Sequence, residues 1–310
     1  MLPPPHFIVN PAAASGRALR WWRAALPVLQ KHFPGLTFAV SDDRHTLDEL
    51  VATALVQDRH FLIGVGGDGT HHDIVNALVR YDALTKVTYA PLPLGSGNDW
   101  CRTLGIPRHI LRWIEVIKRG HTIPHRIGRL TYQVRARSQV QHFVNVAGLA
   151  YDAEVVRRSA GLGLKHRLLY PVLTLAYLRY FTPPELELDY DGQTVNGRFH
   201  TINLGIGRYN GGGMRLVPQA DPVADTLALT YAEGLPLSRI LVNGWRFYTD
   251  SIGKVDGVIT SHATMVRITG LTGLEADGEW LGAPTLVEAS LSAERLQVVV
   301  GNEATRSRVT

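Results

Sequence analysis

The sequence predicts a mixed α/β chain, with an open parallel-sheet domain first and a mainly antiparallel, β-rich domain after it. Its 310 residues exceed the usual size of one hydrophobic core, and a hydrophobic content of 45% is enough to fill two. In the first third of the chain, short apolar runs alternate with longer segments of helical periodicity, which is typical of βα units. Further along, short apolar segments are separated by turn signals, which favours antiparallel strands.

The N-terminal part alternates strands and helices. We expect strands at 7–9, 36–40, 61–65 and 87–92, and helices at 17–33, 46–57 and 70–81. This order predicts a doubly wound sheet that binds ligands at the carboxyl ends of its strands.

The second part is expected to contain strands at 130–134, 142–146, 185–190, 200–206, 227–231, 263–268 and 296–300. Asp191-Gly192 and Asn196-Gly197 are pairs that favour hairpin turns. Helical periodicity is present near 166–180 and 237–248. The expected domains are therefore 1–126 and 127–300, with a C-terminal tail at 301–310 that packs back on the first domain.

Composition narrows the function classes. The apolar run at 168–178 is interrupted by Tyr170 and Pro171 and falls short of the ~20 residues that a membrane span needs. No secretory signal pattern precedes the first strand. The single Cys101 excludes a disulfide within the chain, which favours a reducing cytoplasm.

The charge pattern points to an anionic partner. The net charge of +5 comes mostly from arginine, which suits phosphate, but the basic residues are scattered. A nucleotide or a membrane surface is therefore expected, and no nucleic acid. The apolar stripe at 170–181 favours a domain core, with a position at a membrane interface as the alternative. A homodimer is compatible with the sequence, which does not determine the oligomeric state.

The strongest local motif is the glycine-rich loop at 64–70, between a predicted strand and a predicted helix. Glycines let the backbone approach an anion, and a helix start offers unpaired N–H groups to phosphate oxygens. Thr70 and Asp73 also fit a capping box. The loop has the spacing of a dinucleotide fingerprint, but Asp68 inside it would repel a bare pyrophosphate, and no acidic residue closes the next strand.

A second glycine-rich turn, at 93–99, follows the next predicted strand and should lie beside the first loop. Two such strand ends form a nucleotide-sized crevice, although this turn taken alone favours a helix start capped by Asn98. The sequence has no Gly-x₄-Gly-Lys-Ser/Thr loop and no His-Arg-Asp catalytic loop. Neither common kinase template therefore applies.

Taken together, the motifs resemble the diacylglycerol kinase catalytic-domain family, which includes bacterial lipid kinases and sphingosine kinases. The resemblance covers nearly the whole chain. It is carried by Asn10-Pro11, Ser15-Gly16, Gly66-Gly67-Asp68-Gly69-Thr70, Gly95-Ser96-Gly97-Asn98-Asp99, Gly211-Gly212-Gly213, Pro218-x-Ala220, Asp225-x-Leu227 and Asp277-Gly278-Glu279.

The resemblance implies a nucleotide-binding α/β domain, an antiparallel β-sandwich lipid-binding domain, and catalysis in a cleft between them. ATP is the implied co-substrate with Mg²⁺, and the expected role lies in phospholipid biosynthesis. Asp68 would lie nearest the phosphates and the metal, and Asp277 or Glu279 would be the general base. The residues implied to contact ATP are Asn10, Pro11, Ala12, Ala13, Ala14, Ser41, Gly66, Gly67, Asp68, Gly69, Thr70, His71, His72, Ser96 and Asn98.

Some positions depart from the family pattern. Asp225, with main-chain groups of Pro222 and Leu227, matches a structural Mg²⁺ site, but Thr226 replaces the usual glycine there. His72 is similar to the residue in sphingosine and ceramide kinases. Two alternatives stay open: an NAD kinase-like phosphotransferase, which shares the Gly-Gly-Asp-Gly-Thr loop, and a lipid-binding module without catalysis. The sequence does not choose between Asp277 and Glu279, although the resemblance favours Glu279.

Overall fold

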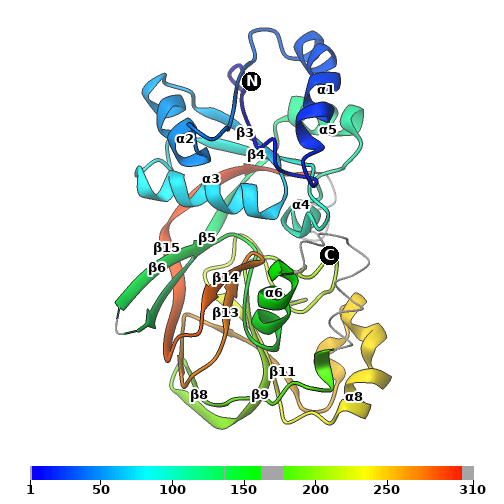
Figure 1. Ribbon diagram of the computed structural model, residues 1–310, viewed down its shortest axis with the longest axis vertical. Coiled ribbons are helices and arrows are strands. Elements are labelled where there is room, and N and C mark those ends of the chain that lie inside the picture. Colours follow the sequence, from blue (N-terminus) through cyan, green and yellow to red (C-terminus); the bar gives the residue numbers. More distant parts are fainter. Residues whose placement is uncertain (1, 136, 162–176, 302–310) are drawn as a thin grey trace. The chain divides into compact units, whose positions relative to one another are not determined.

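The computed structural model describes residues 2–135, 137–161 and 177–301. They form two compact units, residues 1–125 with the segment from 294, and residues 126–293 (Figure 1). The chain leaves the first unit within β5 (Thr122–Val134) and returns within β15 (Leu286–Val299). The domain boundaries predicted from the sequence stay a proposal. The predicted second domain includes residues 294–300, whereas in the structure these residues belong to the first unit.

The first unit is built on a parallel sheet with the strand order β15–β4–β3–β1–β2. The prediction of an open parallel sheet is confirmed. Its complete strands are β1 (His6–Val9), β2 (Thr37–Val40), β3 (Phe61–Gly66) and β4 (Thr88–Pro93). Its helices are α1 (Ala18–His32), α2 (Leu47–Val56), α3 (Asp68–Arg80), α4 (Asp99–Thr103) and α5 (Ile110–Arg119).

Aromatic packing holds one helix layer on this sheet. The ring of Phe7 in β1 lies 5.2 Å from that of Trp22 in α1 and 6.3 Å from that of Trp113 in α5, measured between centroids. In Figure 1, α1 and α5 lie on one side of the sheet, and α2 and α3 lie together on the other. Helices therefore cover both faces, and the strand ends remain available for loops.

The first residues of α2 and α3 decide which helix has a capping box. In α2, Thr46 accepts the Glu49 N–H at 3.3 Å and Glu49 accepts the Thr46 N–H at 2.7 Å, a complete capping box. The capping box predicted for Thr70 and Asp73 is wrong, because α3 begins two residues earlier, at Asp68. Gly67 is the N-cap and supplies no side chain.

The second unit contains antiparallel strands in two layers, which confirms the predicted sandwich. Its further elements are β6 (Arg137–Phe143), β7 (Val146–Ala150), α6 (Tyr151–Gly161), β8 (Glu185–Tyr190), β9 (Gln193–Gly205), β10 (Leu227–Glu233), α8 (Leu237–Val242), η1 (Gly244–Tyr248), η2 (Ile252–Lys254), β11 (Val258–Ala263), β12 (Met265–Thr269), β13 (Leu274–Ala276) and β14 (Glu279–Gly282). One layer runs β14–β13–β7–β9–β10–β11, and the other runs from β9 through β8 and β12 to β15. Leu188, Ile202, Leu229 and Ile268 belong to the buried cluster of this unit.

Turn positions were predicted with mixed success. Asp191 and Gly192 close the β8–β9 hairpin with φ values of 45° and 84°. The second predicted turn is wrong, because Asn196 pairs with Glu187 inside β9. Once the first turn fixes the register, the neighbouring residues continue the ladder. The predicted strand 142–146 is interrupted at residues 144 and 145, and most of the helix predicted near 166–180 lies outside the described residues.

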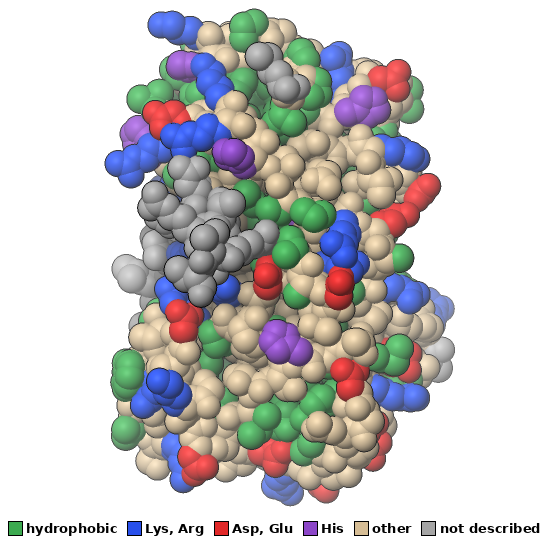
Figure 2. All heavy atoms as spheres, turned by 180° about the vertical axis from the view of Figure 1, so that it is seen from behind, with side chains coloured by type: hydrophobic (Ala, Val, Ile, Leu, Met, Phe, Trp, Pro, Cys, Tyr) green, Lys and Arg blue, Asp and Glu red, His purple; other side chains and the backbone are tan. Residues whose placement is uncertain are grey.

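None of the helices described in the structure is long and apolar enough to cross a membrane. On the face shown in Figure 2, basic and acidic side chains are interspersed. This distribution agrees with the scattered arginines of the sequence.

Candidate active site

The carboxyl ends of the parallel strands gather the predicted nucleotide residues at one edge of the first unit's sheet. β3 lies between β1 and β4, and β2 lies beyond β1. The loop that starts at Asn10 follows β1, and Ser41 follows β2. The glycine loop at 66–70 follows β3, and the turn at 94–98 follows β4. Topology therefore collects segments that are up to 88 residues apart in sequence, from 10 to 98.

The two glycine-rich loops touch through their main chains. The Leu94 N–H donates to the Gly66 carbonyl at 2.7 Å. A Cβ atom built on Gly95 would lie 2.6 Å from the Gly67 Cα and 2.7 Å from the Asn98 Oδ1. One built on Gly97 would lie 2.9 Å from the Asp68 Oδ2. Only glycine allows this approach, which keeps main-chain groups of both loops close together.

We expect Gly95→Ala to disrupt this loop pair. The added methyl group meets backbone rather than a side chain that can move aside, so we expect a loss of roughly 1–3 kcal/mol in the free energy of unfolding. Thermal unfolding and the KM for ATP are the measurements, and the KM should rise about tenfold. Gly197→Ala is the matched control, because its added Cβ meets only ordinary contacts, the nearest at 3.5 Å. Equal behaviour of the two variants would contradict the role of the contact.

The loop after β1 is fixed by Asn10. Its Nδ2 donates to the Thr70 Oγ1 at 3.0 Å, and its Oδ1 accepts the Ala12 N–H at 3.0 Å. Ala14 and Ser15 have positive φ values of 53° and 57°, although neither is glycine. Backbone strain of this kind accumulates at binding sites. Asn10 thus links the loop that contains Pro11, Ala12, Ala13 and Ala14 to the first turn of α3, which contains Gly69.

The second loop is stabilised by two side chains. Asn98 has a left-handed conformation, with φ 54°, and its amide bonds both the N–H and the carbonyl of Gly95 at 2.9 Å. It therefore does not cap α4 as an alternative reading of the sequence suggested. The Arg108 Nη2 donates to the carbonyls of Gly95, Ser96 and Gly97 at 3.3, 3.0 and 3.1 Å. Sequence reasoning missed Arg108, because no local motif marks it.

The two histidines after Thr70 are buried, and the side chain of His71 is fully buried. The His71 Nδ1 lies 2.8 Å from the Tyr89 hydroxyl, and burial lowers the pKa of His71 to about 3. A neutral, enclosed imidazole cannot reach a nucleotide. The side chain of His71 therefore belongs to the core of the first unit, and the predicted ATP contact at this position is left to the main chain. His72 is 3% exposed, which leaves its side chain little contact with solvent as well.

The acidic motif of the second unit forms the turn between β13 and β14. Asp277 and Gly278 have φ values of 52° and 86°. The Asp277 carboxylate accepts the N–H groups of Val144 and Asn145 at 2.9 Å and that of Val146 at 3.3 Å. Glu279 is exposed at the start of β14. Asp277 therefore holds the main chain together, while Glu279 presents its carboxylate to solvent.

An arginine side chain lies at the predicted structural metal site. The guanidinium of Arg126 forms an ion pair with Asp225, and the main-chain N–H of Arg126 donates to the Pro222 carbonyl at 2.7 Å. Thr226 is not among the residues with positive φ, so threonine fits the backbone there. Among the residues that the structure describes, no cluster of three or more His, Cys, Asp or Glu side chains could hold a metal ion. The Asp225 carboxylate is thus paired with Arg126, which competes with a structural Mg²⁺ at Pro222, Asp225 and Leu227, and this metal site stays a prediction.

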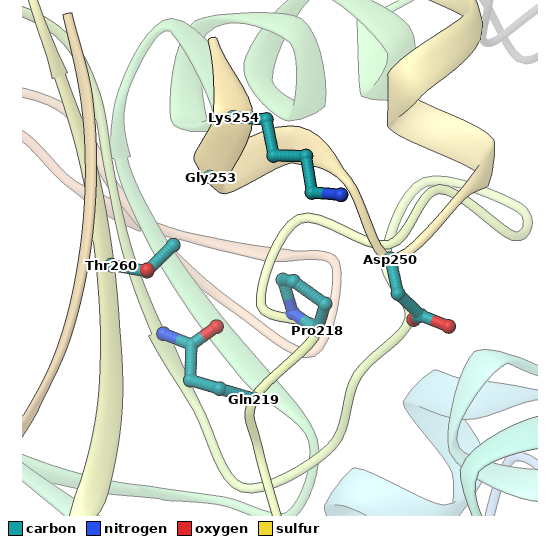
Figure 3. Close-up of a pocket in the computed structure, with 6 residues that line it drawn as sticks. All are labelled: Pro218, Gln219, Asp250, Gly253, Lys254 and Thr260. Carbon is teal, nitrogen blue, oxygen red and sulfur yellow. The ribbon is translucent and has the colours of Figure 1, made fainter. Parts of the chain in front are cut away.

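The second unit contains an apolar pocket of about 280 Å³. Leu235, Phe247 and Val255 are among its apolar lining residues, and Asp152 and Asn203 are among the few polar ones. A second pocket has a mixed lining, and Figure 3 shows the Lys254 side chain extending toward the side where Asp250 lies, with Gln219 and Thr260 on the other side. The apolar pocket has the lining that a hydrocarbon chain requires.

Comparison with known proteins covers both halves of the chain. Residues 4–130 match the diacylglycerol kinase catalytic domain, and residues 144–300 match the YegS C-terminal NAD kinase beta sandwich-like domain. The diacylglycerol kinase of Mycobacterium tuberculosis is 25% identical over 94% of this chain and 93% of its own length. The diacylglycerol kinase of Bacillus subtilis is 27% identical over 79% of this chain and 78% of its own length.

Solved structures show the same fold. A diacylglycerol kinase from Bacillus anthracis superposes with a TM-score of 0.72 at 20% identity, over 97% of both chains. An NAD kinase from Archaeoglobus fulgidus, solved in complex with ATP, is more distant, with a TM-score of 0.52 at 13% identity over 98% of this chain and 96% of that one. From the matches to both domains we conclude that the chain belongs to the diacylglycerol kinase catalytic-domain family and is a lipid kinase, a phosphotransferase.

Proposed function

We propose that the protein transfers the γ-phosphate of ATP, bound with Mg²⁺, to a hydroxyl group of a diacylglycerol-like or sphingoid lipid. The observation that carries the proposal is the pair of glycine loops whose main chains touch at the end of β3 and β4. Such loops favour the close approach of phosphate oxygens to the backbone. Phosphoryl transfer depends mostly on positioning and charge stabilisation, which is what a fixed loop pair can supply.

Different residues of the first unit would bind the phosphates and the metal ion. Main-chain groups of 66–70 and 95–97 would surround the phosphates, and Asn10 and Ser96 would offer polar side-chain atoms. Asp68 is half-buried in the first turn of α3, and its Oδ1 accepts the Trp100 N–H at 3.3 Å. Its Oδ2 is then directed toward the Gly97 side of the loop. Asp68 would bind the Mg²⁺ ion, or an ordered water, beside the phosphates. Mg²⁺ prefers oxygen ligands, and a carboxylate supplies them.

For the general base we choose Glu279. A base must be able to reach the acceptor hydroxyl and take its proton. Glu279 is exposed, whereas the Asp277 oxygens are already engaged by three main-chain N–H groups. The exposure of Glu279 thus supports the same choice as the family resemblance.

The lipid chain would enter the apolar pocket of the second unit. Burying a hydrocarbon chain there contributes about 0.8 kcal/mol for each CH₂ group removed from water. The acceptor would be taken from a membrane surface, by peripheral contact of a protein that works in the cytoplasm.

We expect Gly244→Phe to test the pocket. Gly244 lines it, a Cβ built there meets no atom within 4 Å, and its φ is not positive. A phenyl group should therefore fit without strain and take up space that the lipid needs. The KM for a long-chain acceptor should rise about tenfold or more while the KM for ATP stays unchanged. An unchanged lipid KM in a folded variant would exclude this pocket as the chain-binding site.

An assay of radiolabelled ATP against a mixed lipid extract tests the proposal as a whole. We expect label in the organic phase, in a phosphomonoester lipid, and only when Mg²⁺ is present. If a water-soluble acceptor were labelled and no lipid were, the lipid assignment would be wrong.

NAD is the second candidate acceptor, because the fold is shared with an NAD kinase and the loop 66–70 has the composition of that group. A coupled assay for NADP formation separates the two. We expect no NADP.

A further inference from the structure

A fully buried acid lies directly beneath the acidic turn. Glu275, in the middle of β13, is 0% exposed. Its Oε2 accepts the Gly278 N–H at 2.8 Å, and its Oε1 accepts the Asn210 Nδ2 at 3.3 Å. Among the described residues, no ion pair of Glu275 with Lys, Arg or His is present. Glu275 thus joins the turn of Asp277 and Gly278 to the glycine-rich loop at 211–213 from the inside.

The groups around Glu275 disfavour a negative charge on it. Asp152 from α6 and Asp277 from the turn are the acids that face it, and Asn210 and Asn203 are its neutral neighbours. Burial, the largest effect, raises the pKa of Glu275 well above its ordinary value, and the neighbouring acids Asp152 and Asp277 raise it further. The hydrogen bonds from the Gly278 N–H and from Asn210 lower it in part. Burial also raises the pKa of Asp152. An acid in such surroundings keeps its proton.

Asn203 supplies an independent reason for a proton at this place. Its Nδ2 donates to the Thr201 Oγ1 at 2.8 Å, and the Thr201 hydroxyl donates to Asp152, which fixes the orientation of the amide. The Asn203 Oδ1 is then left buried with no hydrogen-bond partner. A Cβ built on Gly148 would lie 2.7 Å from the Glu275 Oε1 and 3.4 Å from the Asn203 Oδ1, so both atoms lie on the same side of Gly148. A protonated Glu275 brings the missing donor to this side.

We infer that Glu275 is an uncharged, proton-bearing positioning residue that holds the Asp277-Gly278-Glu279 turn and thereby fixes the direction of Glu279. The inference rests on the proposed role of Glu279 as the base. Glu275 touches no reacting atom itself. It acts through the Gly278 N–H, one residue before Glu279, and the hydrogen bond from Asn210 keeps the acid in place.

The test compares Glu275→Gln with Glu275→Leu. Glu275→Gln keeps the shape and an oxygen for the Gly278 N–H, and it is uncharged at every pH. Its amide NH₂ replaces Oε1, so it supplies a donor on the side of the Asn203 Oδ1 and gives up only the weak acceptor for the Asn210 Nδ2, at 3.3 Å. Its kcat at neutral pH should remain within about threefold of the wild type. Leucine removes the acceptor of Gly278, so kcat should fall about 10- to 100-fold with little change in the KM for ATP. Loss of activity in Glu275→Gln equal to that in Glu275→Leu would overturn the inference, because the charge would then be required.

A pH series of thermal unfolding tests the proton without using activity. A folded-state pKa above the unfolded value means that the folded state binds more protons, so this group's contribution to stability falls as pH rises above about 4.5 toward the folded pKa. The amide of Glu275→Gln does not titrate, so this variant does not lose stability in this way as pH rises. The unfolding temperature of Glu275→Gln minus that of the wild type should therefore increase from about pH 5 to pH 8. Glu187→Gln, on the exposed face of β8, is the matched control and should give a constant difference.

A difference for Glu275→Gln that is constant or falls with pH would mean that Glu275 is ionised when folded, and would overturn the inference. This readout is separate from the proposed function. If the wild-type protein phosphorylated no lipid, the proposed function would fail, while the unfolding series would still decide whether Glu275 holds a proton.

Discussion

Glu279→Gln should lower kcat by roughly 10²–10⁴-fold, because the amide keeps the shape of the side chain and removes its basicity. Glu279 is exposed and begins β14, so the substitution leaves no buried group without a partner. We therefore expect the unfolding temperature and the KM for ATP to stay at their wild-type values. Steady-state kinetics with saturating lipid is the measurement, with Glu187→Gln as the matched surface control.

Near-normal turnover of Glu279→Gln would exclude Glu279 as the base. Asp68 would then become the better candidate, because the Asp277 oxygens are committed to main-chain N–H groups.

Asp277→Asn should mainly destabilise the second unit. The carboxylate accepts the N–H groups of Val144, Asn145 and Val146, whereas an amide offers one oxygen and places N–H donors against main-chain donors. We expect the free energy of unfolding to fall by roughly 2–4 kcal/mol, and activity to fall with it because the turn that precedes Glu279 loosens. Chemical denaturation monitored by circular dichroism measures the first effect.

Asp256→Asn is the matched control for this prediction. Asp256 is 90% exposed and pairs with Arg239, so its loss should change stability by no more than about 0.5 kcal/mol. A stable Asp277→Asn variant with strongly reduced turnover would contradict the account, since Asp277 would then be the base rather than a structural residue.

The features predicted from the sequence are those that depend on local patterns. Strand and helix periodicity in the first 100 residues predicts the parallel sheet, because each βα unit repeats the same sequence signals. Glycine motifs at the strand ends predict loops that the sheet topology then brings together. The Asp191-Gly192 turn also depends only on neighbouring residues, and its position is confirmed.

The predictions that failed depend on partners far away in the sequence. Asn196-Gly197 has the composition of a turn, but pairing with β8 extends the strand through it. Thr70 has the composition of a helix cap, but its hydroxyl accepts a hydrogen bond from Asn10. His71 follows a phosphate-loop motif, yet the helix turns its side chain toward Tyr89 in the core.

The functional residues that the sequence did not indicate also depend on partners far away in the sequence. Arg108 reaches three carbonyls of the second loop only because the chain turns back after α4. Glu275 lies in β13, just before the turn of Asp277 and Gly278, and no local motif marks it. Its burial beside Gly148, Asn203 and Asn210 appears only in the folded chain.

The central claim, phosphoryl transfer from ATP to a lipid hydroxyl, is tested most directly by one competition experiment. The protein is incubated with ATP, Mg²⁺, NAD and mixed micelles that contain a diacylglycerol and a sphingoid base, and all products are identified by mass spectrometry. We predict that ADP and a phosphorylated lipid form in equal amounts, that neither forms with Glu279→Gln at a comparable rate, and that NADP is absent. Formation of NADP without lipid phosphate, or of ADP with no phosphorylated acceptor, would contradict the account.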